Sequence, residues 1–328
     1  MVGGTRRPGG GAAELTPARP AGGGAAELTT GLAGEARPVG GGTAELTAGL
    51  AGEARRAGGG TAELTAGLRA GYDAAAQRWE EGPGAVYGRL AQALVAAAPV
   101  SLAGALVLDL GAGTGLAGRA ALAAGARQVV AADLSLGMLR HARDLGGRAG
   151  GAWDPVAADA VALPFRDRRF DLVLAAFCLN HLDSLGAGLA EVRRVGAAIA
   201  ASVFAPGWSH PAPEAVEEVL GSFGYQPPAW HVTLSPGSRA GDPGELAAAA
   251  AAAGFTAVRV RTADVHTGLV TPAELASWRL GLAQVAPFLR SLDAPGRAEV
   301  RRAAEQAVAD AVPADAPMVV SMVILTAR

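Results

Sequence analysis

The sequence contains no lysine, and its charge is nearly balanced. All 28 basic residues are arginine, 30 residues are acidic, and the formal net charge is −2. No run of basic residues is longer than two arginines, whereas a nucleic-acid-binding surface needs a basic patch. We therefore expect no nucleic-acid partner. The missing lysine, together with abundant alanine and glycine, is typical of a GC-rich genome and carries no information about mechanism.

Cysteine and long hydrophobic runs are also scarce. Cys178 is the single cysteine, so an intrachain disulfide is excluded and a reducing, cytoplasmic location is expected. We interpret it as a small buried hydrophobic residue rather than a nucleophile. The first residues lack the apolar core of a signal peptide. The alanine-rich run 246–253 is too short and too weakly apolar to span a bilayer, so we expect no membrane partner.

The most informative segment is 107–116, VLDLGAGTGL. Apolar residues that lead into Asp109 predict a buried strand, and the alternating glycines Gly111, Gly113 and Gly115 predict a tight turn that opens a helix. Free N–H groups at a helix N-terminus suit a nucleotide or nucleoside cofactor. The turn alone is a weak signal, because it also fits the G-x-G-x-x-G pattern of NAD-binding folds or a turn without a ligand.

Three acidic residues at predicted strand ends refine this interpretation. Asp109 would face the cofactor crevice, where a carboxylate suits a sulfonium or an amino group; the alternative is a turn or helix-capping aspartate. Asp133 ends the second predicted strand and can accept both hydroxyls of a ribose, in NAD or in S-adenosylmethionine. Asp159 ends the third predicted strand, where it can bind an adenine amino group.

Predicted strands and helices alternate along the first part of the folded region. That alternation is typical of a parallel, doubly wound α/β sheet. The expected strands span residues 105–110, 128–133, 155–159, 170–177, 197–205, 256–263 and 318–326.

Taken together, the glycine motif, the acidic residues and the LPF…FD segment before the fourth strand resemble the class I S-adenosylmethionine-dependent methyltransferases. The closest likeness is to the small-molecule branch with the ubiquinone and menaquinone C-methyltransferases, and it covers 72–204 well. The resemblance implies S-adenosyl-L-methionine as cofactor and a seven-stranded Rossmann-like sheet of order 3-2-1-4-5-7-6, with the last strand antiparallel and helical cap insertions. It implies these cofactor-binding residues: Asp109, Gly111, Gly113, Gly115, Asp133, Leu134, Met138, Asp159, Ala160, Phe177 and Tyr72.

The predicted activity is methyl transfer to a small-molecule metabolite, by in-line displacement on an aligned nucleophile. His181 directly follows the fourth strand, near the expected methyl end of the cofactor, and an ordinary histidine pKa near 6.5 suits a general base. The alternative is that His181 only shapes its loop. No metal site is predicted. The rival functions are a nicotinamide-dependent oxidoreductase and a catalytically silent cofactor-binding protein.

The chain divides into a repetitive segment and a folded region. Residues 1–70 repeat a glycine- and alanine-rich unit with few large apolar groups, which predicts a flexible tail; a partner-binding repeat is the alternative. The methyltransferase domain is expected over 71–328, with N-terminal helices at 71–104, a cofactor-binding core at 105–205 and cap insertions at 206–253 and 268–317. The insertions should build a pocket for a largely apolar acceptor, and the alternative, expected for more than half of its residues individually, is packing within helical caps. The residues are Trp208, His210, Tyr225, Trp230, His231, Trp278, Arg279 and Phe288.

Overall fold

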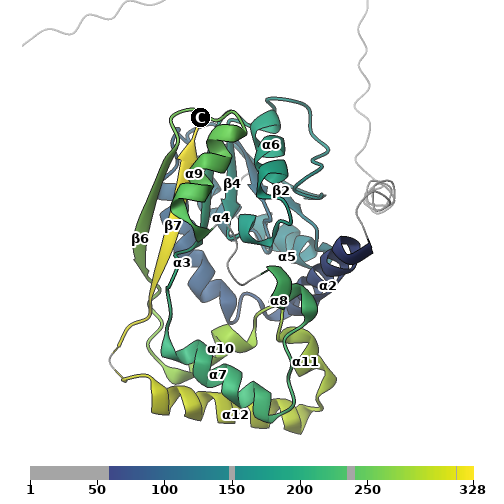
Figure 1. Ribbon diagram of the computed structural model, residues 1–328, viewed down its shortest axis with the longest axis vertical. Helices are drawn as coiled ribbons and strands as arrows, with labels where there is room; N and C mark the ends of the chain where they lie inside the picture. The colour runs from purple at the N-terminus through teal and green to yellow at the C-terminus, as the bar shows by residue number, and fades with distance from the viewer. Residues whose placement is uncertain (1–58, 148–151, 235–240, 315) are drawn as a thin grey trace, which may run out of the picture. The chain divides into compact units, whose positions relative to one another are not determined.

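One sheet organises the fold, and its strands are β1 (Leu106–Leu110), β2 (Gln128–Asp133), β3 (Ala152–Ala157), β4 (Leu172–Ala176), β5 (Ile199–Phe204), β6 (Arg259–His266) and β7 (Val319–Ala327). Their order is β3-β2-β1-β4-β5-β7-β6, and Figure 1 shows β7 beside the edge strand β6. Strand β7 runs antiparallel to β5 and β6, and the remaining pairs are parallel. The predicted order and direction are thereby confirmed. This computed structural model describes residues 59–147, 152–234, 241–314 and 316–328, all within the unit 42–328.

Helices cover both faces of the sheet and extend past one end of it (Figure 1). One face carries α3 (Pro83–Ala96), α4 (Leu116–Ala123) and α5 (Leu136–Gly146), and the other carries α6 (Leu185–Val195) and α9 (Pro243–Ala252). A cap gathers beyond the carboxyl ends of the parallel strands, made of α7 (Pro211–Ser222), α8 (Ala229–Leu234), α10 (Pro272–Leu280), α11 (Ala286–Ser291) and α12 (Ala294–Ala311). The remaining elements are α2 (Gly59–Ala75) and the 3-10 turns η1 (Ala76–Arg78) and η2 (Leu179–His181).

The central strand β1 is buried on both faces, which explains its continuous apolar sequence. Leu106, Leu108 and Leu110 pack in the cluster beneath α6 and α9, whereas Val107 packs in the cluster beneath α3 and α4. Successive side chains of a strand alternate between faces. Asp109 therefore shares the face of Val107, and the sequence places a carboxylate inside an apolar interior at the carboxyl end of the strand.

Most described helices begin at a side chain that accepts from the free N–H groups of the first turn. Such caps stabilise a helix by about 1 kcal/mol each. Helix α4, like α3 and α11, has no side-chain cap at its N-cap position, which is Gly115. In its first turn the Gly118 N–H donates to Asp109, which lies on the neighbouring strand β1. The capping residues elsewhere include Ser135, Ser184, Asp242, Thr271 and Asp293.

Trp153 determines how α4 and α5 approach the edge strand β3. A Cβ added at Gly118 would lie 2.7 Å from the indole ring, and one added at Gly115 would lie 2.6 Å from it. Gly146, the last residue of α5, also lies directly against this ring. Both helices come close to the sheet here because glycine leaves room for the indole.

The third and sixth strands differ from their predicted bounds. Strand β3 begins at Ala152 and ends at Ala157, so Asp159 lies after the strand. The prediction that Asp159 ends this strand is therefore wrong. Pro155 was expected to open this strand, but an edge strand tolerates proline in its interior because one side needs no N–H donor. Strand β6 begins at Arg259 rather than 256 and continues to His266.

Helix α2 begins at Gly59, within the segment predicted to be a flexible tail, so that boundary at residue 70 is wrong. Residues 1–58 lie outside the described part of the chain. Leu64 and Leu68 pack against the cluster that contains Trp230. Gly71 approaches the backbone of Ala283 so closely that a Cβ would lie 2.9 Å from its carbonyl oxygen. Tertiary packing stabilises this helix despite the low intrinsic propensity of glycine.

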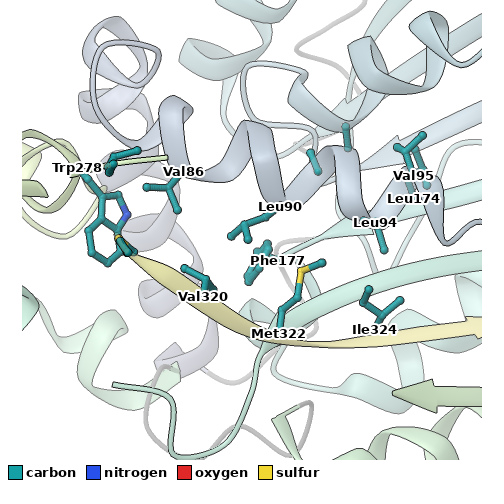
Figure 2. Packing of buried hydrophobic residues seen from close by; sticks show 14 of the residues in the cluster. Val86, Leu90, Leu94, Val95, Leu174, Phe177, Trp278, Val320, Met322 and Ile324 are labelled. Carbon is teal, nitrogen blue, oxygen red and sulfur yellow. The ribbon is translucent and has the colours of Figure 1, made fainter. Parts of the chain in front are cut away.

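A single apolar cluster joins the sheet to the cap (Figure 2). Trp278 of α10 packs in the same cluster as Val86 of α3 and Met322 of β7. Helix α9 was predicted to belong to the cap, yet Leu246 packs against the sheet with α6. Among the described helices, none is both long enough and apolar enough to cross a bilayer.

Candidate active site

The loop after β1 holds its three predicted glycines in the left-handed region. Gly111, Gly113 and Gly115 have φ angles of +63°, +56° and +89°, which side chains disfavour. A Cβ at Gly111 would lie 2.6 Å from the sulfur of Cys178. At Gly113 a Cβ would meet no atom within 4 Å. Gly111 is therefore enforced by packing, whereas the backbone at Gly113 borders open space.

Two carboxylates, the buried Asp109 and the half-buried Asp133, flank this turn. Asp109 accepts a hydrogen bond from the Gly118 N–H at 2.7 Å, in the first turn of α4. Asp133, at the end of β2, accepts from the Gly113 N–H at 2.7 Å and from the Ser135 N–H at 2.8 Å. Asp109 thus has the turn or helix-capping role that was the alternative to a cofactor-binding role. It leaves further lone pairs of both carboxylates for a ligand.

Burial raises the pKa of both acids. The pKa of Asp109 rises from 3.8 to about 7, because desolvation outweighs the hydrogen bond from Gly118. Desolvation also raises the pKa of Asp133, against hydrogen bonds from Ser135 and Gly113. A cationic group placed beside Asp109 would favour its ionised form, so the site is suited to attract positive charge.

Three polar contacts tie the N-terminal segment to the loops at the carboxyl edge. Asp73 of α2 accepts from the Ser135 hydroxyl at 2.6 Å and from the Gly137 N–H at 2.7 Å, at the start of α5. Glu80 accepts from the Thr114 hydroxyl and pairs with Arg119 of α4. The third contact joins Tyr72 to His181.

The hydroxyl of Tyr72 lies 2.9 Å from Nε2 of His181. Asn180 Nδ2, which can only donate, also faces this nitrogen at 3.4 Å. Nε2 is therefore the nitrogen without hydrogen, and it accepts from Tyr72. His181 Nδ1 and Asn180 Oδ1 are buried and have no hydrogen-bond partner among the described residues.

Burial lowers the pKa of His181 to about 4, with a further contribution from His231. The ordinary pKa near 6.5 that was assumed from sequence is therefore wrong for this site, because sequence does not reveal the burial. His181 is neutral at pH 7. It can accept a proton, but its protonated form is disfavoured.

A cavity of about 240 Å³ opens between the strand ends, the N-terminal helices and the cap. Among the predicted site residues, Asp109, Gly113, Phe177, His181 and Tyr72 line it. The predicted residues outside its lining are Gly111, Gly115, Asp133, Leu134, Met138, Asp159 and Ala160. Met138 is fully buried against α2 and η1, and Asp159 accepts a hydrogen bond from the Val161 N–H in its own turn.

The cap insertions contribute fewer residues to the cavity than predicted. Trp230, His231 and Arg279 line it, whereas Trp208 and Trp278 pack in the hydrophobic core. The sequence interpretation missed Asn180 and Phe204 as lining residues. Asn180 comes three residues after the predicted fourth strand, and Phe204 is the next-to-last residue of the predicted fifth strand; closeness to a strand end is the signal that could have found them.

The turn, the acids and the sheet order agree with the comparisons with known proteins. Residues 107–197 match the family described as "Methyltransferase domain". A demethylmenaquinone methyltransferase of Thermobifida fusca is 45% identical over 105 residues, 32% of this chain and 44% of that protein. A malonyl-[acyl-carrier protein] O-methyltransferase of Halorhodospira halophila is 36% identical over 161 residues, 47% of this chain and 51% of that protein.

Solved structures include the phosphoethanolamine N-methyltransferase 2 of Haemonchus contortus in complex with S-adenosyl-L-methionine. It is 19% identical, with a TM-score of 0.44, over 73% of this chain and 51% of that chain. The matched segments of the two curated relatives span only about half of those proteins, 44% and 51%. Residues 107–197 therefore match the methyltransferase-domain family, and the predicted resemblance to class I methyltransferases is confirmed.

Proposed function

We propose that the protein transfers a methyl group from S-adenosylmethionine to a small-molecule acceptor. The observation that carries this proposal is the open space beside the backbone of Gly113. It lines the cavity at φ +56°, with no atom within 4 Å of the Cβ position. Asp109 and Asp133 flank it from adjacent strands. Open backbone between two carboxylates suits a ligand that carries both a cationic group and a ribose.

The residues of this chain would bind the cofactor in distinct ways. S-adenosylmethionine supplies an electrophilic methyl group on a sulfonium. Asp109 would stabilise its cationic part, and Asp133 would accept the ribose hydroxyls. Tyr72 and Phe177 would border its methionine end, as lining residues of the cavity. By resemblance, the adenine side would be formed by Leu134, Met138, Asp159 and Ala160, and the turn by Gly111 and Gly115.

Alignment of the acceptor is the main source of rate in this proposal. His181 is the candidate general base, and the structural role remains its alternative. Its pKa of about 4 means that it would already be deprotonated above pH 5. We therefore expect that kcat does not fall as the pH is lowered from 9 to 5, because His181 stays deprotonated over this range. If His181 is the base, His181→Ala should lower kcat by about 10²- to 10⁴-fold without changing cofactor affinity.

The acceptor and the compartment are part of the proposal. The names of the two relatives give different acceptors, demethylmenaquinone and malonyl-[acyl-carrier protein], so neither is assigned to this chain. A cytoplasmic location is supported by Cys178, the single cysteine, which is buried and whose pKa burial raises to about 12.

Cofactor binding tests the proposal directly. S-adenosylhomocysteine should raise the melting temperature and bind in calorimetry, whereas NAD(H) should do neither. Binding of NAD(H) alone would favour the oxidoreductase. Binding of S-adenosylhomocysteine, with no label transferred from methyl-labelled S-adenosylmethionine to any acceptor in a broad metabolite mixture, would favour the catalytically silent protein.

A further inference from the structure

The acceptor end of the cavity carries one permanent positive charge. Among the described residues that line the cavity, Arg279 is the one with a permanently charged side chain and Asp109 is the one carboxylic acid, and they come from opposite ends of it. Asp109 ends β1, whereas Arg279 belongs to α10 in the cap. The cofactor end is therefore acidic and the cap end is basic.

Arg279 is held in place by groups on its outer side. Its Nη2 donates to Glu217 of α7, and its guanidinium lies 5.5 Å from the ring centre of Trp278. The Arg279 side chain is 15% exposed, whereas that of Glu217 is 55% exposed. The pair is thus oriented with its anion toward solvent and its cation toward the interior.

The charge of Arg279 reaches the wall of the cavity. It lowers the pKa of Tyr87, although burial raises that pKa to about 12, and it also lowers the pKa of His231. Nε and Nη1 of Arg279 have no hydrogen-bond partner among the residues that the structure describes. Each of these donors can make one charge-assisted hydrogen bond to an oxygen of a carboxylate.

The wall beside this charge is a continuous row of aromatic rings. Trp79 and Tyr87 are stacked, with ring centres 5.5 Å apart and planes inclined by 19°. Tyr87 meets Phe177 at 5.3 Å, and Phe177 meets Phe204 at 4.7 Å. All four rings line the cavity, with Trp230 also in its lining. Such faces and edges favour a flat ring over a flexible alkyl chain.

We propose that the acceptor is an aromatic carboxylic acid, whose ring lies against this row and whose carboxylate is bound by Arg279. This inference rests on the proposed function, because it names the acceptor class of the same site. It makes Arg279 the residue that determines specificity for an anionic acceptor. The group to be methylated is then a second substituent of the ring, at the end that faces the cofactor.

Binding of three small probes tests the proposal, on the full-length protein saturated with S-adenosylhomocysteine. 4-Hydroxybenzoate should bind at least tenfold more tightly than 4-hydroxybenzamide, which lacks the charge, and than 4-hydroxycyclohexanecarboxylate, which lacks the flat ring. Equal binding of the amide, or no binding of the benzoate, would overturn the proposal.

Substitutions locate the binding. Arg279→Met should weaken 4-hydroxybenzoate binding about ten- to a hundredfold, as expected for a lost charge-assisted hydrogen bond. Arg301→Met, on the exposed face of α12, is the matched control and should have no effect. Glu217→Gln should retain binding within threefold, because Arg279 keeps its charge.

Two results would contradict the assignment: undiminished benzoate binding in Arg279→Met, or a loss in Glu217→Gln as large as that in Arg279→Met. Affinity for S-adenosylhomocysteine, measured for each variant, reports whether the fold and the cofactor end are intact. If wild-type protein binds the benzoate through Arg279 but not S-adenosylhomocysteine, the proposed function fails while the anion site stands.

Discussion

Replacing Asp109 by asparagine should stabilise the protein at neutral pH. The Asp109 residue is 1% exposed, and the Gly118 N–H is its one hydrogen-bond donor among the described residues. Burial raises its pKa from 3.8 to about 7. The folded state therefore retains the proton up to about pH 7, whereas the unfolded state releases it near pH 4. Asparagine keeps an oxygen that can accept from Gly118 and does not ionise.

The magnitude follows from the two pKa values of Asp109. Between them the unfolded state binds fewer protons than the folded state, so the free energy of unfolding falls by about 1.4 kcal/mol per pH unit. The accumulated loss is about 1.5 kcal/mol at pH 5 and about 4 kcal/mol above pH 7, where it levels off. The stability advantage of Asp109→Asn over wild type should therefore be about 2–3 kcal/mol larger at pH 8 than at pH 5.

Urea unfolding of both proteins at pH 5, 6.5 and 8, without cofactor, measures this difference. His181 acts in the opposite direction: its lowered pKa makes the free energy of unfolding rise with pH between about 4 and 6.5. That contribution is common to both proteins and cancels in the difference. Asp144→Asn, at an exposed position of α5, is the control for the substitution itself. A difference between Asp109→Asn and wild type that does not change from pH 5 to pH 8 would refute the argument.

The same substitution has a functional consequence. A cationic ligand group beside Asp109 requires its ionised form, so binding below pH 7 must release a proton. The affinity of wild type for S-adenosylhomocysteine should then fall by up to about tenfold per pH unit below the pKa. In Asp109→Asn the affinity should be lower and nearly independent of pH, apart from other titrating groups. Calorimetry at pH 6 and 8 in two buffers detects both the affinity and the released proton.

Three further predictions concern the surroundings of the site. Asp133→Ala should weaken S-adenosylhomocysteine binding about ten- to a hundredfold, since hydrogen bonds to a charged group contribute roughly 1.5–3 kcal/mol; unchanged binding in calorimetry would remove its ribose role. Tyr72→Phe should cost about 1–3 kcal/mol in urea unfolding, because buried Nε2 of His181 loses its donor; no loss would mean that the contact is not formed. Gly146→Ala should destabilise by about 1–3 kcal/mol through a clash with Trp153, and Trp153→Leu should restore part of it.

The strand order and the glycine turn could be predicted because their signals are local. β1 and β4 are short apolar runs, as strands buried on both faces must be. Asp109 and Asp133 follow from the same pattern, since each marks the point where a run ends at the carboxyl edge. Alternating glycines predict positive φ angles, and Gly111 and Gly113 have them.

The remaining features depend on contacts between residues far apart in sequence. The glycine-rich sequence of helix α2 predicts a tail, and the helix is stabilised by packing near Trp230, which is distant in the chain. Arg279 was noted only as one polar residue of an insertion, since sequence does not show which side of α10 faces the cavity. The lowered pKa of His181 results from burial beneath the N-terminal segment and α8.

The cost of the buried acids is itself an argument for function. A turn that only had to cap α4 would be better served by asparagine at position 109, which accepts from Gly118 without the penalty of a charge. Asp133 is likewise desolvated, and Phe177, at φ +54°, holds a conformation that side chains disfavour. Unfavourable features of this kind tend to gather where a ligand binds. Here these features lie together at the carboxyl edge of the sheet, beside the open backbone of Gly113. A bound cation would stabilise the ionised form of Asp109 and so offset the cost of its burial.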